Sequence, residues 1–306
     1  MKFLQKEFPA LQFFTLPSYN LKYSKNGKYL VLKLLMQLPC IHSAIKKEKK
    51  QIEELIANED IAGIISDNRF GVYSAKIPSV YITHQTQVLS GILTYFTTKI
   101  HQKIIEKYHE CWIPDTENRE LSGVLSNCKG IKTKVSYIGT LSRLKCVKSE
   151  KKNQLLVLLS GLEPQRTLLE NTLLNELKNF NGNVLFVRGV LHEERLVAPP
   201  NLTMVNYLKS EDLEKAMNES EMVIARSGYS TIMDLAALGK KAYFIPTPGQ
   251  YEQLYLAKYL ANKKIAPYCK QNDFKVENLN EVNFYSGFLS GKNEFDLKLF
   301  SLFNSK

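Results

Sequence analysis

The sequence predicts an α/β protein with two Rossmann-like domains, each a doubly wound parallel sheet. Three observations support this class. The chain has 306 residues, enough for two domains of about 150 residues each. Short, uninterrupted apolar runs alternate with segments of helical periodicity, which is the pattern of parallel strands buried on both faces. A polar, lysine-rich stretch at residues 143–153 separates two such runs and predicts a domain boundary.

Four apolar runs predict the strands of the first domain. They lie at residues 61–66, 79–83, 111–114 and 135–138. Their continuous hydrophobicity is typical of strands in a buried parallel sheet. A helix is expected at residues 90–108, and the chain is predicted to open with a helix at 3–8 and a strand at 11–16. We assign residues 1–145 to this N-terminal domain.

Strands and helices alternate regularly in the second half of the chain. The predicted strands lie at residues 155–159, 184–187, 203–206, 222–225 and 242–245, and the predicted helices at 164–179, 210–217, 231–238 and 251–262. The first of these helices contains four leucines at helical spacing, namely Leu168, Leu169, Leu173 and Leu177. We assign residues 150–290 to a C-terminal domain. Residues 291–306 are expected to form a final helix that returns to the first domain.

Composition excludes several classes of protein. No apolar run reaches the roughly 18 residues that a membrane-spanning helix needs, and the first residues lack the apolar core of a signal peptide. The five cysteines are scattered without a C-x-x-C pair, and the five histidines lack metal-ligand spacing. We therefore expect neither a disulfide framework nor a metal site, and a reducing cytoplasm fits best.

The formal net charge of +11 favours an anionic partner. The basic residues are spread along the chain, with the densest cluster at residues 46–50. We interpret this cluster as a solvated helix face, and contact with the inner face of a membrane is the alternative. No nucleic-acid-binding motif accompanies the charge, so a nucleic-acid partner is not expected.

Glycine and polar residues follow three of the predicted strands of the C-terminal domain. Ligands of doubly wound sheets bind beyond the carboxyl ends of the strands, so binding chemistry is expected in these loops. A helix N-terminus attracts phosphate there, and a carboxylate accepts hydrogen bonds from sugar hydroxyls. Each loop alone is equally typical of an ordinary helix start, for which Ser230-Thr231 offers an N-cap. Their succession after strands of one sheet favours a binding site.

Residues 155–265 resemble the C-terminal domain of glycosyltransferase family 28, in the group that includes the lipid II N-acetylglucosaminyltransferase. The matching stretches are Ser160-Gly161 with Gln165-Arg166, Arg226-Ser227-Gly228 through Asp234, and Gly249 through Gln253. The resemblance implies a GT-B fold, in which two Rossmann-like domains face a cleft. Residues 135–142 resemble the segment that crosses between the two domains in this family.

The resemblance also implies a set of donor-binding residues. Residues 227–231 would contact the diphosphate, Asp234 would hold the ribose, Arg188 would contact the base, and Glu252 with Gln253 would read the donor sugar. The complete implied set is Ser160, Gly161, Gln165, Arg166, Arg188, Arg226, Ser227, Gly228, Ser230, Thr231, Asp234, Glu252 and Gln253.

The N-terminal half resembles the family more loosely. Asp67 and His84 end two predicted strands, and either could act as the catalytic base. A hydrogen-bonded structural role is an equally consistent interpretation of His84. Members of the family open with a strand and a glycine-rich loop, whereas this sequence contains no G-x-G motif. We therefore expect the first strand-loop-helix unit to be missing, the N-terminal domain to be incomplete and this chain alone to be poorly active.

The predicted reaction is transfer of a hexose from a nucleoside-diphosphate sugar to an acceptor hydroxyl. By resemblance the nucleotide is UDP and the acceptor is a lipid-linked molecule or a glycan, which would suit peripheral membrane association. The chain lacks a D-x-D motif, a P-loop and a G-x-S-x-G elbow, so we expect metal-independent chemistry with no cofactor besides the donor. The alternatives are an epimerase or hydrolase on the same scaffold and a non-catalytic nucleotide-sugar-binding protein.

Overall fold

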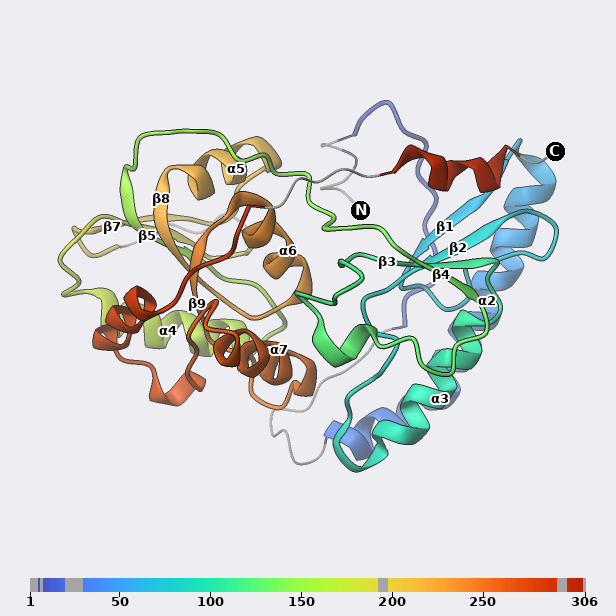
Figure 1. The fold of residues 1–306 in the computed structure, drawn as a ribbon, viewed down its shortest axis with the longest axis horizontal. Helices are drawn as coiled ribbons and strands as arrows, with labels where there is room; N and C mark the ends of the chain where they lie inside the picture. Colours follow the sequence, from blue (N-terminus) through green and yellow to red (C-terminus); the bar gives the residue numbers. More distant parts are fainter. Residues whose placement is uncertain (1–4, 6–7, 20–29, 192–197, 291–295, 305–306) are drawn as a thin grey trace. The chain divides into compact units, whose positions relative to one another are not determined.

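The computed structural model describes residues 5, 8–19, 30–191, 198–290 and 296–304, with side chains described from residue 39 onward within the first helix. The chain forms two compact units. Unit 1 comprises Met1–Pro114, Leu125–Ile138 and Phe295–Lys306, and unit 2 comprises Asp115–Val124 and Gly139–Glu294. Each unit contains one parallel sheet (Figure 1).

Unit 1 is built on a four-stranded parallel sheet in the order β1-β2-β3-β4. Its elements are α2 (Leu30–Asn58), β1 (Ile64–Asp67), β2 (Ser79–Ile82), the 3₁₀ helix η2 (Gly91–Leu93), α3 (Thr94–Ile105), β3 (Glu110–Ile113) and β4 (Lys134–Tyr137). The central strands are buried on both faces, which explains their continuous apolar sequences. Tyr81, Ile105, Tyr108, Cys111 and Ile113 form a core cluster between the sheet and the C-terminal half of α3.

The predicted strand at residues 11–16 is wrong. These residues lie in the described part of the chain and run alongside α2 without joining the sheet. The carbonyl of Thr15 accepts a hydrogen bond from the Gln51 side chain (2.9 Å) in place of a strand partner, and Leu16 packs against Ile52. The predicted helix at 3–8 lies almost wholly outside the described residues, and the predicted helix at 90–108 is shorter than expected, as η2 and α3.

Unit 2 is built on a five-stranded parallel sheet in the order β7-β6-β5-β8-β9. The strands are β5 (Asn153–Leu158), β6 (Val184–Val187), β7 (Leu202–Val205), β8 (Ser220–Ala225) and β9 (Lys241–Phe244). The helices are α4 (Gln165–Leu177), α5 (Ser210–Asn218), α6 (Tyr229–Leu238) and α7 (Tyr251–Asn262). In Figure 1, α4 and α7 lie on one side of this sheet and α5 on the other.

The strand order of unit 2 reverses between β5 and β8. From β5 the chain proceeds outward to β6 and β7, then returns to β8 beside β5 and proceeds the other way to β9. This is the doubly wound arrangement that the sequence predicts, and the reversal creates a switch point at the carboxyl ends of β5 and β8. The predicted apolar face of the first helix is confirmed for Leu169, Leu173 and Leu177 of α4, which are fully buried in the core. It is wrong for Leu168, which is exposed.

The C-terminal residues form a 3₁₀ helix, η6 (Leu297–Phe303), within unit 1. Phe300 and Phe303 pack edge-on against Trp112 of β3, with ring centroids 5.8 and 6.2 Å apart. The rest of the predicted helix at 291–306 falls largely outside the described residues. Across the described ranges, no helix combines the length and the hydropathy that crossing a lipid bilayer would require.

Candidate functional site

Two open glycine turns flank the switch point of unit 2. Gly161 follows β5 with φ +106, and Gly228 follows β8 immediately before α6. A Cβ atom built on either glycine would meet no heavy atom within 4 Å. The backbones of both turns therefore face open space at the edge of the sheet where doubly wound proteins bind their ligands.

The start of α6 is not capped by a side chain. Gly228 is the N-cap residue, and no side-chain oxygen accepts a hydrogen bond there. The predicted cap by Ser230-Thr231 is wrong, because the helix already begins at Tyr229 and both residues lie inside its first turn. Ser230 is exposed and Thr231 is half-buried. An uncapped first turn leaves backbone N–H groups and the positive end of the helix dipole for an anion.

Arg226 connects the loops around this edge of the sheet. Its side chain is only 2% exposed. One terminal nitrogen donates to the carbonyls of Ile245 (3.0 Å) and Pro246 (3.2 Å), and the other donates to the carbonyl of Gln165 (2.8 Å) and to Oε1 of Gln271 (2.6 Å). Burial lowers the pKa of Arg226 to about 10. The guanidinium thus holds the turns after β5, β8 and β9 together.

Ser227 and Gln253 link the turn after β8 to the start of α7. The buried Ser227 hydroxyl donates to the carbonyl of Gln253 (2.8 Å). The Oε1 atom of Gln253 accepts from the backbone N–H of Thr247 (2.8 Å), which closes the turn before α7. Glu252 lies partly exposed in the first turn of the same helix. The structure therefore brings the second and third predicted loops together at one edge of the sheet.

Asp234 is held by a residue that the sequence did not single out. The Ser142 hydroxyl donates to Oδ1 of Asp234 at 2.6 Å. Burial raises the pKa of Asp234, while the hydrogen bond from Ser142 and the positive charge of Arg143 act in the opposite direction. Ser142 and Arg143 lie at and just beyond the end of the predicted crossing segment, so that resemblance was the available signal for them.

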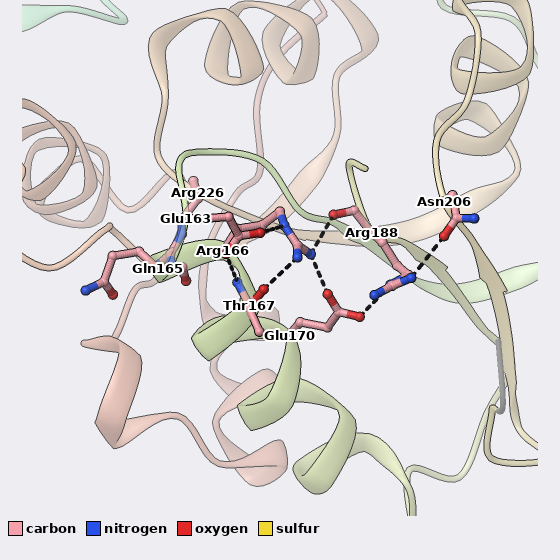
Figure 2. A network of polar contacts seen from close by, with 8 residues as sticks. All are labelled: Glu163, Gln165, Arg166, Thr167, Glu170, Arg188, Asn206 and Arg226. Carbon is pink, nitrogen blue, oxygen red and sulfur yellow. Dashed lines mark hydrogen bonds and ion pairs between the residues drawn. The ribbon is translucent and has the colours of Figure 1, made fainter. Parts of the chain in front are cut away.

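Arg166 and Arg188 share one buried carboxylate, that of Glu170 (Figure 2). Arg166 bonds one oxygen of Glu170, and Arg188 bonds the other through Nε at 2.5 Å. Arg166 also donates to Glu163 (2.6 Å), and Arg188 to Asn206 (3.0 Å). Both guanidinium groups are thus neutralised inside the fold, where they fix the carboxyl ends of β5, β6 and β7 against one another.

A second close contact fixes the turns after β5 and β6. Gly189 has φ +72, and a Cβ built on it would lie 2.3 Å from the carbonyl oxygen of Leu159. Only glycine fits such a backbone approach. Ser160 and Gly161, which follow Leu159, are exposed, and Gln165 is half-buried at the start of α4. The turn after β5 is therefore anchored at its base and open at its tip.

In unit 1, the two predicted bases lie at the carboxyl ends of neighbouring strands. Asp67 is the exposed last residue of β1, and its register partner Ile82 ends β2. His84 follows two residues after Ile82 and is half-buried. Nearby, Tyr81 bonds both Asn68 (2.8 Å) and the ring of buried His101 (3.0 Å). Asp67 and His84 therefore share one edge of the sheet of unit 1.

Solved glycosyltransferase structures share this fold. The glycotransferase of kitacinnamycin aligns with a TM-score of 0.59 over 88% of this chain and 76% of that one, at 12% identity. The calicheamicin glycosyltransferase CalG4 aligns with a TM-score of 0.57 over 92% and 80%, at 10% identity. Arabidopsis thaliana UGT89C1, complexed with UDP-L-rhamnose, aligns with a TM-score of 0.57 over 98% of this chain and 83% of that one, at 10% identity. The chain thus has the GT-B fold, as the sequence predicts.

Sequence comparison finds a family match within unit 2. Residues 165–283 match the glycosyltransferase family 28 C-terminal domain. The UDP-N-acetylglucosamine--N-acetylmuramyl-(pentapeptide) pyrophosphoryl-undecaprenol N-acetylglucosamine transferase of Haemophilus ducreyi is 24% identical over 226 residues, 69% of this chain and 59% of that enzyme. Its namesake from Acinetobacter baumannii (strain AYE) is 36% identical over 87 residues, 28% of this chain and 24% of that enzyme. Residues 165–283 of this chain are thus similar to the C-terminal domain of glycosyltransferase family 28, and the matches to the two relatives cover less than two thirds of either relative's length.

Proposed function

We propose that unit 2 binds the diphosphate of a UDP-sugar at the open turns after β5 and β8, and that the chain transfers the hexose to an acceptor hydroxyl. The observation that carries this proposal is the pair Gly161 and Gly228, whose backbones face open space beside the uncapped start of α6. The match of residues 165–283 to a glycosyltransferase family domain supports a nucleotide-sugar donor.

The donor-binding residues divide into two groups in this proposal. Ser160, Gly161, Gly228, Ser230 and Thr231 offer backbone and hydroxyl groups to the diphosphate. Asp234 accepts from the ribose, Glu252 accepts from the hexose, and the Gln253 amide nitrogen donates to it. The remaining residues position these turns, because their side chains are engaged within the fold: Gln165, Arg166, Arg188, Arg226 and Ser227.

The proposed chemistry is a displacement at the anomeric carbon. The acceptor oxygen forms a bond to the anomeric carbon as the bond between that carbon and the diphosphate oxygen breaks. The electron pair of the broken bond leaves with the nucleoside diphosphate. The start of α6 stabilises the charge on the departing diphosphate, which is the task a metal ion performs in other transferases. The proton of the acceptor hydroxyl passes to a catalytic base, for which Asp67 and His84 are the candidates.

The proposed acceptor is lipid-linked. The relatives named above act, by their names, on a pyrophosphoryl-undecaprenol substrate. The choice of acceptor is independent of the donor site, so a glycan acceptor would leave the donor-binding proposal intact.

Substitution of Gly228 tests the donor site directly. The backbone of Gly228 has φ −75 and ψ 141, which any residue adopts, and a Cβ atom there would meet no heavy atom within 4 Å. Gly228→Val should therefore fold normally and place its methyl groups where the diphosphate binds. We expect calorimetric affinity for UDP to fall at least about tenfold, while the melting temperature stays unchanged.

Glu221→Val is the matched control, because Glu221 is exposed near the opposite end of the same strand. Equal UDP affinity in both variants would refute the proposed site. Parallel titrations with UDP-, GDP- and dTDP-sugars identify the nucleobase of the preferred donor. Donor consumption without any acceptor would instead indicate the epimerase or hydrolase, and tight donor binding without turnover would indicate a binding protein.

A further inference from the structure

Arg226 differs from the two other arginines at the carboxyl edge of the unit 2 sheet, because it has no carboxylate partner within the described residues. Arg166 and Arg188 share the carboxylate of Glu170, as Figure 2 shows. The hydrogen bonds of Arg226 go instead to neutral oxygens, namely three backbone carbonyls and the side-chain amide of Gln271. Arg226 therefore keeps a full positive charge inside the fold.

Burial makes the charge of Arg226 costly, because ionised side chains inside proteins are ordinarily paired. Desolvation lowers the pKa of Arg226, and no neighbouring charge contributes to the shift. The Nε atom is also buried, and it has no hydrogen-bond partner among the residues that the structure describes. The fold thus retains an unbalanced cation, which a nearby anion would stabilise.

The guanidinium lies between the turns that form the proposed donor site. It donates to the carbonyl of Gln165, which begins α4 after the open turn at Gly161, and to that of Pro246 after β9. Arg226 itself precedes Gly228, the N-cap of α6, by two positions. A phosphate in the open turns cannot touch a side chain that is almost fully buried. The charge therefore acts on it through the protein interior, where the low dielectric strengthens the attraction.

We propose that Gln271 is a positioning residue that leaves the charge of Arg226 available to a phosphate bound at the open turns of unit 2. This inference rests on the proposed function and extends it to a residue outside those turns. Gln271 begins the 3₁₀ helix η4 (Gln271–Asp273) and is 5% exposed. Its amide oxygen accepts from the guanidinium (2.6 Å), and its amide nitrogen donates to Oε1 of Gln165 (3.4 Å).

The neutrality of the Gln271 side chain is the feature that matters in this inference. A carboxylate of the same shape would keep the contact with Arg226 and neutralise the cation. An amide holds the guanidinium in the same place and leaves its charge unbalanced. The attraction for the diphosphate is thereby preserved, at the expense of a buried unpaired charge.

Gln271→Glu tests this inference, because it changes the charge and keeps the shape of the side chain. Calorimetric affinity for UDP should fall at least about tenfold. Affinity for uridine, which carries no phosphate, should change less than about twofold. The melting temperature should stay equal or rise, because an ion pair replaces an unpaired buried charge and rotation of the Gln165 amide lets its nitrogen donate to the new carboxylate.

Two further variants separate the charge from the geometry. Asn272→Asp adds the same negative charge at the exposed neighbouring position, so it should change UDP affinity less than about twofold. Gln271→Met removes both hydrogen bonds of the side chain and leaves Arg226 charged, so it should weaken UDP binding less than about threefold. Gln271→Met also tests the inference if Gln271→Glu fails to fold. A loss of about tenfold or more in Gln271→Met would show that Gln271 acts through geometry alone.

Inorganic pyrophosphate, titrated in parallel, separates this inference from the proposed function. Equal weakening of UDP and uridine by Gln271→Glu, or equal weakening of UDP by Asn272→Asp, would overturn the inference. UDP affinity that Gly228→Val lowers and Gln271→Glu leaves unchanged would overturn it and keep the donor site. Pyrophosphate binding that Gln271→Glu weakens, with UDP bound no more tightly, would support the inference and refute the UDP-sugar site. Absence of binding by either ligand would overturn both.

Discussion

Ser142 is the residue through which the segment before β5 reaches the proposed donor site. Its hydroxyl donates to Asp234, and this bond favours the ionised carboxylate against the effect of burial. An ionised carboxylate accepts more hydrogen bonds from ribose hydroxyls than a protonated one does. Affinity for the donor should therefore fall as the pH falls through the raised pKa of Asp234.

Ser142→Ala should weaken donor binding about threefold to tenfold, which corresponds to the free energy of one hydrogen bond. It should also move the midpoint of the pH–affinity curve to higher pH, because the pKa of Asp234 rises further without this bond. Ser142→Thr keeps the hydroxyl and should behave as the unsubstituted protein does. Asp234→Asn should flatten the curve. Isothermal titration with a UDP-sugar at a series of pH values measures all three. An unchanged pH midpoint in Ser142→Ala would show that this hydrogen bond is structural only.

At the scale of elements, the turns after β5 and β6 depend on two glycines with different surroundings. Gly189 combines a positive φ with a close approach to Leu159, whereas Gly161 has a positive φ and open space. Gly189→Ala should lower the free energy of unfolding by about 2–4 kcal/mol, from backbone strain and a steric clash together. Gly161→Ala should cost about 1–2 kcal/mol, from strain alone.

The two glycine variants should also differ in their affinity for UDP. Gly161→Ala, which loses less stability, should lose more affinity than Gly189→Ala. Because the added methyl group of Gly161→Ala projects into the proposed site, that variant should lose UDP affinity out of proportion to its small loss of stability. Urea unfolding and calorimetry on both variants measure the two quantities. If Gly189→Ala proved as stable as Gly161→Ala, the packing of the two turns described above would be incorrect.

The elements themselves were largely predictable from sequence, and the exceptions have physical reasons. A parallel strand buried on both faces is a continuous apolar run, so residues 184–187 predicted β6 without error. The same rule failed at residues 11–16, because Leu11 and Phe14 lie exposed on the surface. An apolar run of strand length indicates that the segment is hydrophobic, but it does not indicate whether a neighbouring strand is present to pair with it.

The structure brings together the loops in which the site was predicted, and it adds contacts that the sequence did not indicate. Glycine turns after successive strands follow from local sequence, so the open edge of unit 2 could be anticipated. The bond from Ser142 to Asp234 joins residues 92 positions apart, and Glu170 lies between two arginines only once β5 and β6 pair in register. Such partners are set by tertiary structure, so the sequence could not show that both arginines are neutralised.

At the scale of the whole molecule, one short segment packs in unit 2, although the strands that flank it in sequence belong to unit 1. Residues 115–124 fall between β3 and β4 of unit 1, yet they pack within unit 2. The Tyr255 hydroxyl of α7 accepts from the N–H of Val124 (2.8 Å), and the Tyr259 hydroxyl donates to the carbonyl of Arg119 (2.9 Å). Fully buried Asp115 accepts from the N–H groups of Leu121 and Ser122, which folds the segment on itself.

These contacts predict how the segment exchanges its amide protons. The amides of Leu121, Ser122 and Val124 are bonded to groups within unit 2, so they should exchange when unit 2 opens. Saturating UDP, at about 100 times its dissociation constant, stabilises the folded unit by about 2.7 kcal/mol and slows such opening about 100-fold. Hydrogen-exchange mass spectrometry should show peptides from 115–124 slowed together with those of α7.

Tyr255→Phe separates this coupling from simple protection by a bound ligand. The variant loses the acceptor for Val124 and leaves in place the ring of Tyr259, which a Cβ built on Gly123 would meet. Exchange in 115–124 should become faster and insensitive to UDP, while α7 still responds to the nucleotide. If UDP slows α7 in the unsubstituted protein and leaves 115–124 unchanged, the segment opens independently of unit 2. Its tyrosine contacts would then be too weak to join it to that unit.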